Sequence, residues 1–238
     1  MQALSFVQTS LWADYNESLG VWADTVRSES ALFHFVDPED DPPTSCSVVL
    51  PNNLAVTAIA NYTARLVQTS LSAMQRQEAL KFLDHFGDIM QPLHVEALEL
   101  GGNDIDVTCN RSNMGMITRL LRDNYSNSTG TFNSAAVSSW ISCSSTAAPA
   151  TIQDDISTLL ASENELKFRA VIPLVCPLAW AVDSNKVDCF SFQTGGTDLC
   201  TSGYYTGAVP IIEIQIAKGG YRLAAWLNVL IDGATHLP

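Results

Sequence analysis

The sequence predicts a mainly α-helical protein, a single-domain helical bundle with one minor β-hairpin. Apolar residues recur three and four positions apart along much of the chain, as at Leu4, Val7 and Leu11, which is typical of amphipathic helices. Alternation typical of a strand is confined to residues 105–108. The 238 residues, 47% of them hydrophobic, can bury one substantial core or two small ones, and we find no internal repeat. We therefore interpret residues 1–238 as one domain.

Four helices are predicted in the first half of the chain. Gly20 divides the first two, and a turn-rich acidic loop follows at residues 38–43. A capping box begins at Ser72 and includes Gln75, and it should open the fourth helix. Pro92 should end that helix, because proline cannot continue the backbone hydrogen bonds. The expected helices cover about residues 4–11, 19–26, 54–67 and 72–92.

The second half should contain the hairpin and the remaining helices. A Gly-Gly-Asn-Asp turn signal at residues 101–104 precedes the alternating stretch, which should form a short strand or hairpin arm. A connector rich in Ser, Thr and Ala at residues 143–151 is interpreted as a surface loop, and the apolar residues 167–182 should be buried. Helices are expected at residues 114–125, 134–141, 152–160 and 209–231, the last with an irregularity at Gly219–Gly220.

The formal net charge of -13 excludes one class of function. A protein that holds nucleic acid through a basic patch needs a positive surface field, because phosphates are anionic. A polyanionic substrate would therefore require cations bound at the site. No run of about 18 apolar residues is present, so the sequence predicts neither a transmembrane helix nor a membrane partner.

The cysteines and glycosylation sequons favour an oxidising compartment. Six cysteines without a Cys-x-x-Cys pair fit disulfides better than a cysteine zinc site, although spacing alone does not reveal their pairing. The first residues, however, lack the basic and apolar regions of a signal peptide, so either the start is missing or the protein stays inside the cell. Asn-x-Ser/Thr sequons, which suit a secreted glycoprotein, occur at Asn16, Asn61, Asn110, Asn124 and Asn127.

Residues 85–94 carry the clearest chemical signal, because they gather two of the four histidines around a carboxylate. Zinc takes imidazole nitrogen and carboxylate oxygen, and ligands three or four positions apart share one helix face. Pro92 should let His94 fold back toward the face of His85 and Asp88. Asp24 and His34 precede this motif, and the mixed set suits zinc used for hydrolysis. The candidate ligands are Asp24, His34, His85, Asp88 and His94.

These groups lie within a longer series of ordered motifs. The series reads Trp-Ala-Asp at 22–24, His-Phe-Val-Asp at 34–37, Ala-Ile-Ala-Asn-Tyr-Thr at 58–63, Glu-Ala-Leu-Lys-Phe-Leu at 78–83, Gly-Asp at 87–88, Gln-Pro-Leu-His at 91–94, Glu-Ala-Leu-Glu at 96–99, Gly-Gly-Asn at 101–103 and a tail at 204–233. With it the sequence resembles the secreted zinc-dependent single-strand nucleases of fungi and plants, the S-one/P-one type, over most of the chain.

The resemblance implies a helical fold shared with zinc phospholipases C and a cluster of three zinc ions. It also implies an enzyme, an endonuclease that hydrolyses phosphodiester bonds of single-stranded DNA and RNA to 5'-phosphates, with 3'-nucleotidase activity. The implied protein is a secreted, glycosylated monomer with disulfides, and its substrates are single-stranded nucleic acids and 3'-nucleotides.

Residue by residue, the resemblance assigns five positions to zinc. Asp24, His34, His85 and Asp88 match the ligands of one zinc, with Asp24 and Asp88 as the catalytic carboxylates and Asp88 bridging to a second metal. His94 matches a ligand of the remaining zinc.

Four further positions match other family residues. Phe35 and Asp37 match residues that stack on and hydrogen-bond a nucleobase, a role for which an aromatic face is suited because it tolerates any base. Cys46 and Cys189 match a long-range disulfide.

The chain also departs from the family pattern, and the departures predict impaired catalysis. The family's N-terminal tryptophan and nearby histidine, which bind one zinc, are absent, so the domain is expected to lack the family's N-terminal segment. The Asn-Leu-His-x-x-x-Asp segment, which supplies two partners of His94, is also absent, because Asn113 runs straight into Met114. We therefore expect at most one zinc to be held well, since a zinc site needs about three protein ligands.

One spacing leaves the identity of a ligand open. The family's His-Phe-x-Gly-Asp reads His85-Phe86-Gly87-Asp88 here, one residue short, which in a helix rotates the histidine by roughly 100°. Either His85 binds at the three-residue spacing or Asp84 substitutes for it, and we favour His85. The alternative functions are a catalytically inactive, secreted nuclease-like protein and, less favoured, a zinc phospholipase C.

Overall fold

Helices dominate the structure, a computed structural model that describes residues 33–36, 44–45, 54–81, 83, 85–96, 99–102, 105–109, 112–114, 134–143, 150–162, 174–187, 198–199 and 202–237. The predicted mainly α-helical fold is confirmed. No helix in these ranges is both long and apolar enough to span a bilayer. The elements are α4 (Leu54–Val67), α5 (Ala73–Lys81), α6 (His85–Asp88), the 3-10 helix η3 (Pro92–Val95), α7 (Glu99–Gly102), β1 (Val107–Cys109), β2 (Ser112–Met114), α9 (Ser134–Ser139), α10 (Ile152–Ser162), α11 (Val175–Asn185) and α12 (Gly203–Asp232).

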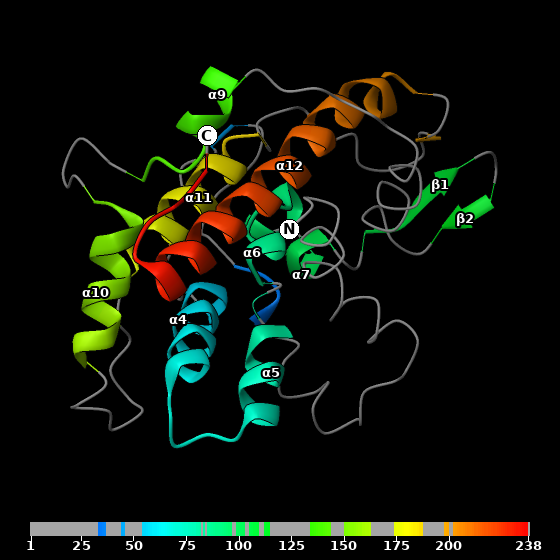
Figure 1. Cartoon of the computed structure of the whole chain (residues 1–238). Helices are drawn as coiled ribbons and strands as arrows, with labels where there is room; N and C mark the ends of the chain where they lie inside the picture. Colours follow the sequence, from blue (N-terminus) through cyan, green and yellow to red (C-terminus); the bar gives the residue numbers. More distant parts are fainter. Residues whose placement is uncertain are drawn as a thin grey trace.

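The longest helix, α12, organises the bundle. It crosses the molecule diagonally and packs against α6 and α10, while α4 and α5 form a helical hairpin next to its C-terminal end (Figure 1). α11 contacts α4, α10 and η3. The β1–β2 hairpin lies at the opposite edge of the view from α10, so the short elements α6 and η3 sit among the longer helices rather than beside the sheet.

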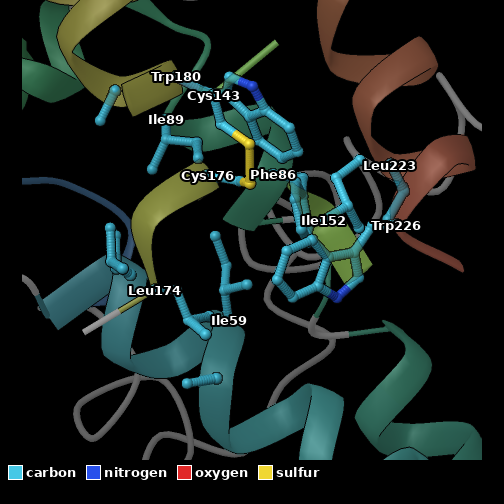
Figure 2. Close-up of a cluster of buried hydrophobic side chains, with 14 of the residues drawn as sticks. Ile59, Phe86, Ile89, Cys143, Ile152, Leu174, Cys176, Trp180, Leu223 and Trp226 are labelled. Atoms are coloured by element: carbon cyan, nitrogen blue, oxygen red, sulfur yellow. A yellow bond between two sulfur atoms is a disulfide. The ribbon is translucent and has the colours of Figure 1, made fainter. Parts of the chain in front are cut away.

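Aromatic side chains from three helices form the centre of the core. Phe86 of α6 lies 5.9 Å from Trp180 of α11 and 5.4 Å from Trp226 of α12, measured between ring centroids, and all three rings are buried (Figure 2). Ile59 of α4 and Leu174 before α11 are fully buried in the same cluster. Because Phe86 stands between His85 and Asp88, the core directly supports the segment that carries the chemical motif.

A disulfide joins Cys143 to Cys176 and lies within this core (Figure 2). Of the surface loop predicted at residues 143–151, Cys143 and Ala150 are buried, Thr151 is exposed, and residues 144–149 lie outside the described residues. The carboxylate of Asp155 accepts hydrogen bonds from the backbone N–H groups of Val175 and Cys176, which satisfies the free N-terminus of α11 from a neighbouring helix. The predicted Cys46–Cys189 pair lies outside the described residues.

Several predicted elements are confirmed. α4 covers residues 54–67 as expected, and α9 and α10 begin at residues 134 and 152. The capping box of α5 forms, since the Ser72 backbone N–H donates to Gln75 Oε1 at 3.0 Å and the Gln75 N–H donates to Ser72 Oγ at 3.3 Å. β1 and β2 pair antiparallel with Val107 opposite Met114, which gives the expected minor hairpin.

The helix predicted to run from residue 72 to residue 92 is wrong. α5 ends at Lys81, α6 is a single turn from His85 to Asp88, and the chain turns through Met90 and Gln91 before η3. In this segment Leu83, Phe86 and Ile89 are buried together with His85 and Asp88. Polar and apolar side chains alike therefore face the interior here, and the amphipathic pattern that predicted one long helix does not hold.

Two further expectations need correction. Met114 belongs to strand β2, so it does not start the helix predicted at 114–125, and the rest of that stretch is outside the described residues. α12 begins at Gly203 and runs without a break through Gly219–Gly220, where an irregularity was expected. A Cβ at Gly219 would lie 3.3 Å from Met90 Cγ, so this glycine allows close approach of α6 rather than a kink. The predicted helices at residues 4–11 and 19–26 and the loop at 38–43 are also outside the described residues.

Candidate metal centre

Three of the predicted ligands converge in the interior. His34 Nδ1 lies 3.1 Å and His85 Nδ1 lies 2.8 Å from the same oxygen, Asp88 Oδ2, and the candidate ligand atoms of the three residues lie within 4.8 Å of one another. All three side chains are buried. His85 and Asp88 are three positions apart on α6 and so share one face of that turn. We call His34, His85 and Asp88 the metal triad.

A backbone contact brings His34 to α6 from more than fifty positions away. The Val36 N–H donates to the His94 carbonyl at 2.6 Å, which ties the 33–36 segment to η3. The imidazole of His34 then packs edge-on against the imidazole of His85, with ring centroids 4.8 Å apart. The triad is therefore built from two chain segments, and the backbone hydrogen bond from Val36 to His94 helps to hold them side by side.

The pKa shifts within the triad favour a charged Asp88 and a neutral His85. Burial alone would raise the pKa of Asp88, but the charge and hydrogen bond of His34, together with the hydrogen bond of His85, lower that pKa below its usual range. Burial lowers the pKa of His85, because its hydrogen bond to Asp88 only partly compensates for the lost solvation. Asp88 therefore remains a carboxylate under mildly acidic conditions, and His85 favours its neutral form.

The other ring nitrogen of His85 is unsatisfied. Nε2 is buried and has no hydrogen-bond partner among the described residues. A buried polar atom without a partner is costly, so its presence points to a group that the protein chain does not supply. Two imidazoles and a carboxylate are the donor types that zinc and similar first-row metal ions take. The triad thus fits a metal ion by its chemistry and by its orphaned nitrogen.

His94 stands apart from the triad on η3. Pro92 occupies the start of this short helix, and the Gln91 side chain accepts a hydrogen bond from the Leu93 N–H at 3.1 Å. His94 Nδ1 donates to the Gly101 carbonyl at 2.7 Å, which leaves the lone pair on Nε2. A backbone partner on one ring nitrogen is the usual way in which a protein orients a histidine ligand. Among the described residues, His34, His85 and Asp88 converge as a possible metal site, and His94 is not part of that group.

Gly101, read from the sequence as part of a turn, contacts two predicted site residues. Its φ is +67°, and a Cβ there would lie 2.7 Å from Phe35 Cβ and 3.3 Å from His94 Cα. Gly102 has a φ of +78°, and a Cβ there would lie 2.7 Å from Leu93 Cβ. Only glycine meets both demands, positive φ and close approach. The diglycine therefore places the Gly101 carbonyl on His94 and packs directly against Phe35.

We expect Gly101→Ala to lower the free energy of unfolding by more than the roughly 1–3 kcal/mol of a strained φ alone, because the new methyl group also collides with Phe35 and His94. Urea denaturation measures the loss. Gly233→Ala is the matched control, since Gly233 has a φ of +79° with no atom within 4 Å of the added Cβ. Equal losses in the two variants would show that the contact with Phe35 and His94 contributes nothing.

The structure places some of the other predicted residues and leaves the rest undescribed. Phe35 is half-buried beside Gly101, and Asn61 is half-buried on α4. His85 lies at the triad, and Asp84, the alternative ligand, is outside the described residues. Also outside them are Asp24, Asp37, Cys46, Cys189, Asn16, Asn110, Asn124 and Asn127.

Sequence reasoning gave no role to several residues near the triad. The Tyr62 ring lies 5.8 Å from the His85 ring, and the Arg65 guanidinium lies over Tyr62 at 5.9 Å. Tyr62 belongs to the motif at residues 58–63, which supplied a resemblance but no function. Glu96, two positions after His94, is buried as well. Gln215 of α12 is also buried, on the helix face that carries Gly219 and Arg222.

Known proteins of similar sequence identify the family of the chain. The family model described as S1/P1 Nuclease matches residues 2–232. The chain is 35% identical to Nuclease PA3 of Penicillium sp, over 91% of this chain and 84% of that protein. It is 34% identical to Nuclease P1 of Penicillium citrinum, with the same coverage, and 35% identical to Nuclease S1 of Aspergillus oryzae, over 95% of this chain and 84% of that protein. The chain belongs to the S1/P1 nuclease family, as its resemblance to the S-one/P-one type predicted.

Proposed function

We propose that the chain is a zinc-dependent endonuclease that hydrolyses phosphodiester bonds of single-stranded DNA and RNA to 5'-phosphates and also acts on 3'-nucleotides, at a reduced rate. The observation that carries this proposal is the buried metal triad with its orphaned His85 Nε2. Membership of a nuclease family supports the reaction class. The net charge of -13 adds a reason for a metal, because an acidic protein needs a cation to approach phosphate.

The residues of the triad would perform distinct tasks. Zinc held there would lower the pKa of a bound water and offset the negative charge on the phosphate. Asp88 supplies an anionic oxygen over a wide pH range, because its pKa is held below the usual value. His85 supplies a neutral nitrogen, because burial lowers its pKa. Asp24 would complete the ligand set as the second catalytic carboxylate, and Asp88 would bridge toward a second metal.

Phe35 and Asp37 would bind the substrate beside the metal. Phe35 is half-buried, so part of its ring remains accessible to stack on a nucleobase. Its position is fixed by Gly101, whose backbone also accepts the hydrogen bond from His94. The Gly101 backbone would thus help to place both the base-stacking residue Phe35 and the candidate metal ligand His94. Asp37 would hydrogen-bond the base.

The reduced rate follows from the ligands that His94 lacks. The family pattern supplies His94 with a histidine and an aspartate from a segment that would follow Asn113, whereas here Asn113 lies in strand β2 next to Met114. One histidine does not hold zinc without further ligands. We therefore propose one zinc held well at the triad and a weak or empty position at His94.

Secretion and glycosylation belong to the same proposal. The Cys143–Cys176 disulfide fits an oxidising compartment, as do the sequons, of which Asn61 lies on the described helix α4. The second candidate is a catalytically inactive, secreted nuclease-like protein, which the incomplete surroundings of His94 favour. A zinc phospholipase C is the least favoured candidate. The enzyme is proposed to act as a monomer.

Elemental analysis of the purified chain, combined with digestion of single-stranded DNA at mildly acidic pH, tests the proposal. One zinc per chain with slow cleavage, faster on single strands than on duplex, is the expected result. Three zincs with rapid turnover would contradict the impairment, and no zinc would contradict the metal triad. One zinc without cleavage would favour the inactive derivative, and release of a phosphorylated headgroup from phosphatidylcholine would favour the phospholipase.

A further inference from the structure

Residues 85–95, here called the metal-binding segment, include His85, Asp88 and His94. Helix α12 contacts this segment through a stripe of three residues that all touch Met90. Gln215, Gly219 and Arg222 are four and three positions apart and so share one helix face. Gln215 Nε2 donates to the Met90 carbonyl at 3.0 Å, Gly219 allows Met90 Cγ to approach, and Arg222 Nη1 lies 2.8 Å from Met90 Sδ. Met90 is two positions after Asp88. The stripe therefore fixes the chain immediately beyond the triad.

The end of helix α11 contacts the same segment at a second point. Asn185 Nδ2 donates to the Val95 carbonyl at 2.7 Å, one position after His94. The preceding residue, Ser184, accepts a hydrogen bond from Gln215 Nε2 at 2.8 Å and donates to the Trp180 carbonyl. All of these polar side chains are buried. Helices α12 and α11 thus hold the metal-binding segment at two points, the carbonyls of Met90 and Val95.

These contacts fall where the segment lacks a regular helical ladder. Between Asp88 and His94 the backbone makes isolated turn hydrogen bonds, from Met90 N–H to the Gly87 carbonyl and from Gln91 N–H to the Asp88 carbonyl. Such turns leave the backbone fewer constraints than a continuous helix. The amide groups of Gln215 and Asn185 supply the missing constraints from outside.

Arg222 has a separate, mainly structural set of partners. Its guanidinium donates to Asp183 at 2.7 Å and to the Trp140 carbonyl at 2.7 Å, and it lies over the Trp180 ring at 5.3 Å. Lys218 also donates to Asp183, at 2.7 Å. Replacing Arg222 would remove one of the two cations that pair with Asp183, and it would disturb several helices together. The two neutral amides are therefore the sharper subjects for a test.

We propose that Gln215 and Asn185 are positioning residues of the metal triad. Gln215 holds the Met90 carbonyl two positions after Asp88, and Asn185 holds the Val95 carbonyl next to His94, whose own carbonyl accepts from the Val36 N–H and so places His34. The inference rests on the proposed function, since it concerns how the triad receives its metal. Neither amide lies among the candidate ligands, so both act through the backbone. Loss of either anchor lets the turn relax and moves the ligands out of register, which weakens metal binding in a protein that remains folded.

Gln215→Met and Asn185→Leu remove the amide while keeping the size of the side chain. Asn228→Leu is the matched control, because Asn228 Nδ2 also donates to a backbone carbonyl, that of Thr235, near the far end of α12. Zinc affinity is measured on the full chain by competition with a chromophoric chelator, well below the unfolding temperature. The absorption bands of bound Co²⁺ report the coordination geometry independently of catalysis.

We expect the two anchor variants to bind zinc about 10- to 100-fold more weakly than the native chain, with altered Co²⁺ bands, as for other residues that orient ligands. The Asn228→Leu control should bind zinc as the native chain does. Native affinity in both anchor variants would overturn the inference while leaving the proposed function intact. A native chain that binds no zinc would overturn the proposed metal centre itself, and the two failures are therefore distinct.

Ser184→Ala guards against an anchor variant that does not fold. The small change removes the Oγ that accepts from Gln215 but leaves the bond from Gln215 to Met90 in place. A smaller loss of zinc affinity in the same direction is expected. If neither anchor variant folds, unchanged zinc affinity in Ser184→Ala would by itself contradict the inference.

Discussion

Asp88→Asn is expected to weaken zinc binding by more than about 100-fold, beyond the 10- to 100-fold typical of losing a residue that only orients a ligand. The change keeps the shape of the side chain but removes the charge that faces both imidazoles. An amide is also a poorer zinc ligand than a carboxylate. Hydrolysis of single-stranded DNA should fall with the loss of metal.

The stabilisation that zinc gives to the fold measures this effect without relying on activity. At a zinc concentration 100 times the native dissociation constant, the native chain should gain about 2.7 kcal/mol, whereas a 100-fold weaker variant should gain only about 0.4 kcal/mol. Asp232→Asn is the control, because that carboxylate is exposed and forms its ion pair with His236, away from the triad. If zinc raised the free energy of unfolding equally in Asp88→Asn and in the native chain, Asp88 would not be a metal ligand.

Phe86→Ala should lower the free energy of unfolding by about 3–5 kcal/mol. The Phe86 ring is fully buried between Trp180 and Trp226, and both indoles are too large to move into the vacated space without disturbing their own helices. Such a loss is a large fraction of the stability of a typical domain. The variant should therefore unfold at a much lower urea concentration.

The same substitution tests the link between core and site. Phe86 lies in α6 between His85 and Asp88, so a cavity beneath it should also loosen the triad. Met74→Ala is the control, because Met74 is 70% exposed and its loss should change stability by no more than about 0.5 kcal/mol. A loss below about 1 kcal/mol in Phe86→Ala would show that the aromatic cluster is not the core.

Elements governed by local sequence were predictable. The bounds of α4 follow from its apolar periodicity, and the start of α5 follows from the Ser72 capping box. The pairing of His85 with Asp88 also follows from a spacing within one helical turn. In each case the residues that decide the structure lie within a few positions of one another, so the sequence displays the cause directly.

Contacts between distant segments were not predictable in the same way. The break between α5 and α6 precedes a turn whose polar residues His85 and Asp88 are buried with Phe86, and the partner of Cys143 is 33 positions away. Gly219 was read as a local irregularity because the residue that occupies the space beside it, Met90, is remote in sequence. A glycine in an apolar helix can mark either a kink or a close contact, and only the structure of the neighbouring segment distinguishes the two.

The contact between Met90 and Gln215 has a consequence for biosynthesis. The two residues are 125 positions apart, so at roughly 5–20 residues per second the ribosome takes about 6–25 s to reach Gln215 after Met90 has been added. During that interval the nascent chain contains both α6 triad residues but lacks the helix that holds their turn. The triad would therefore reach the geometry proposed to bind a metal only late, once α12 has emerged, rather than when its residues are synthesised.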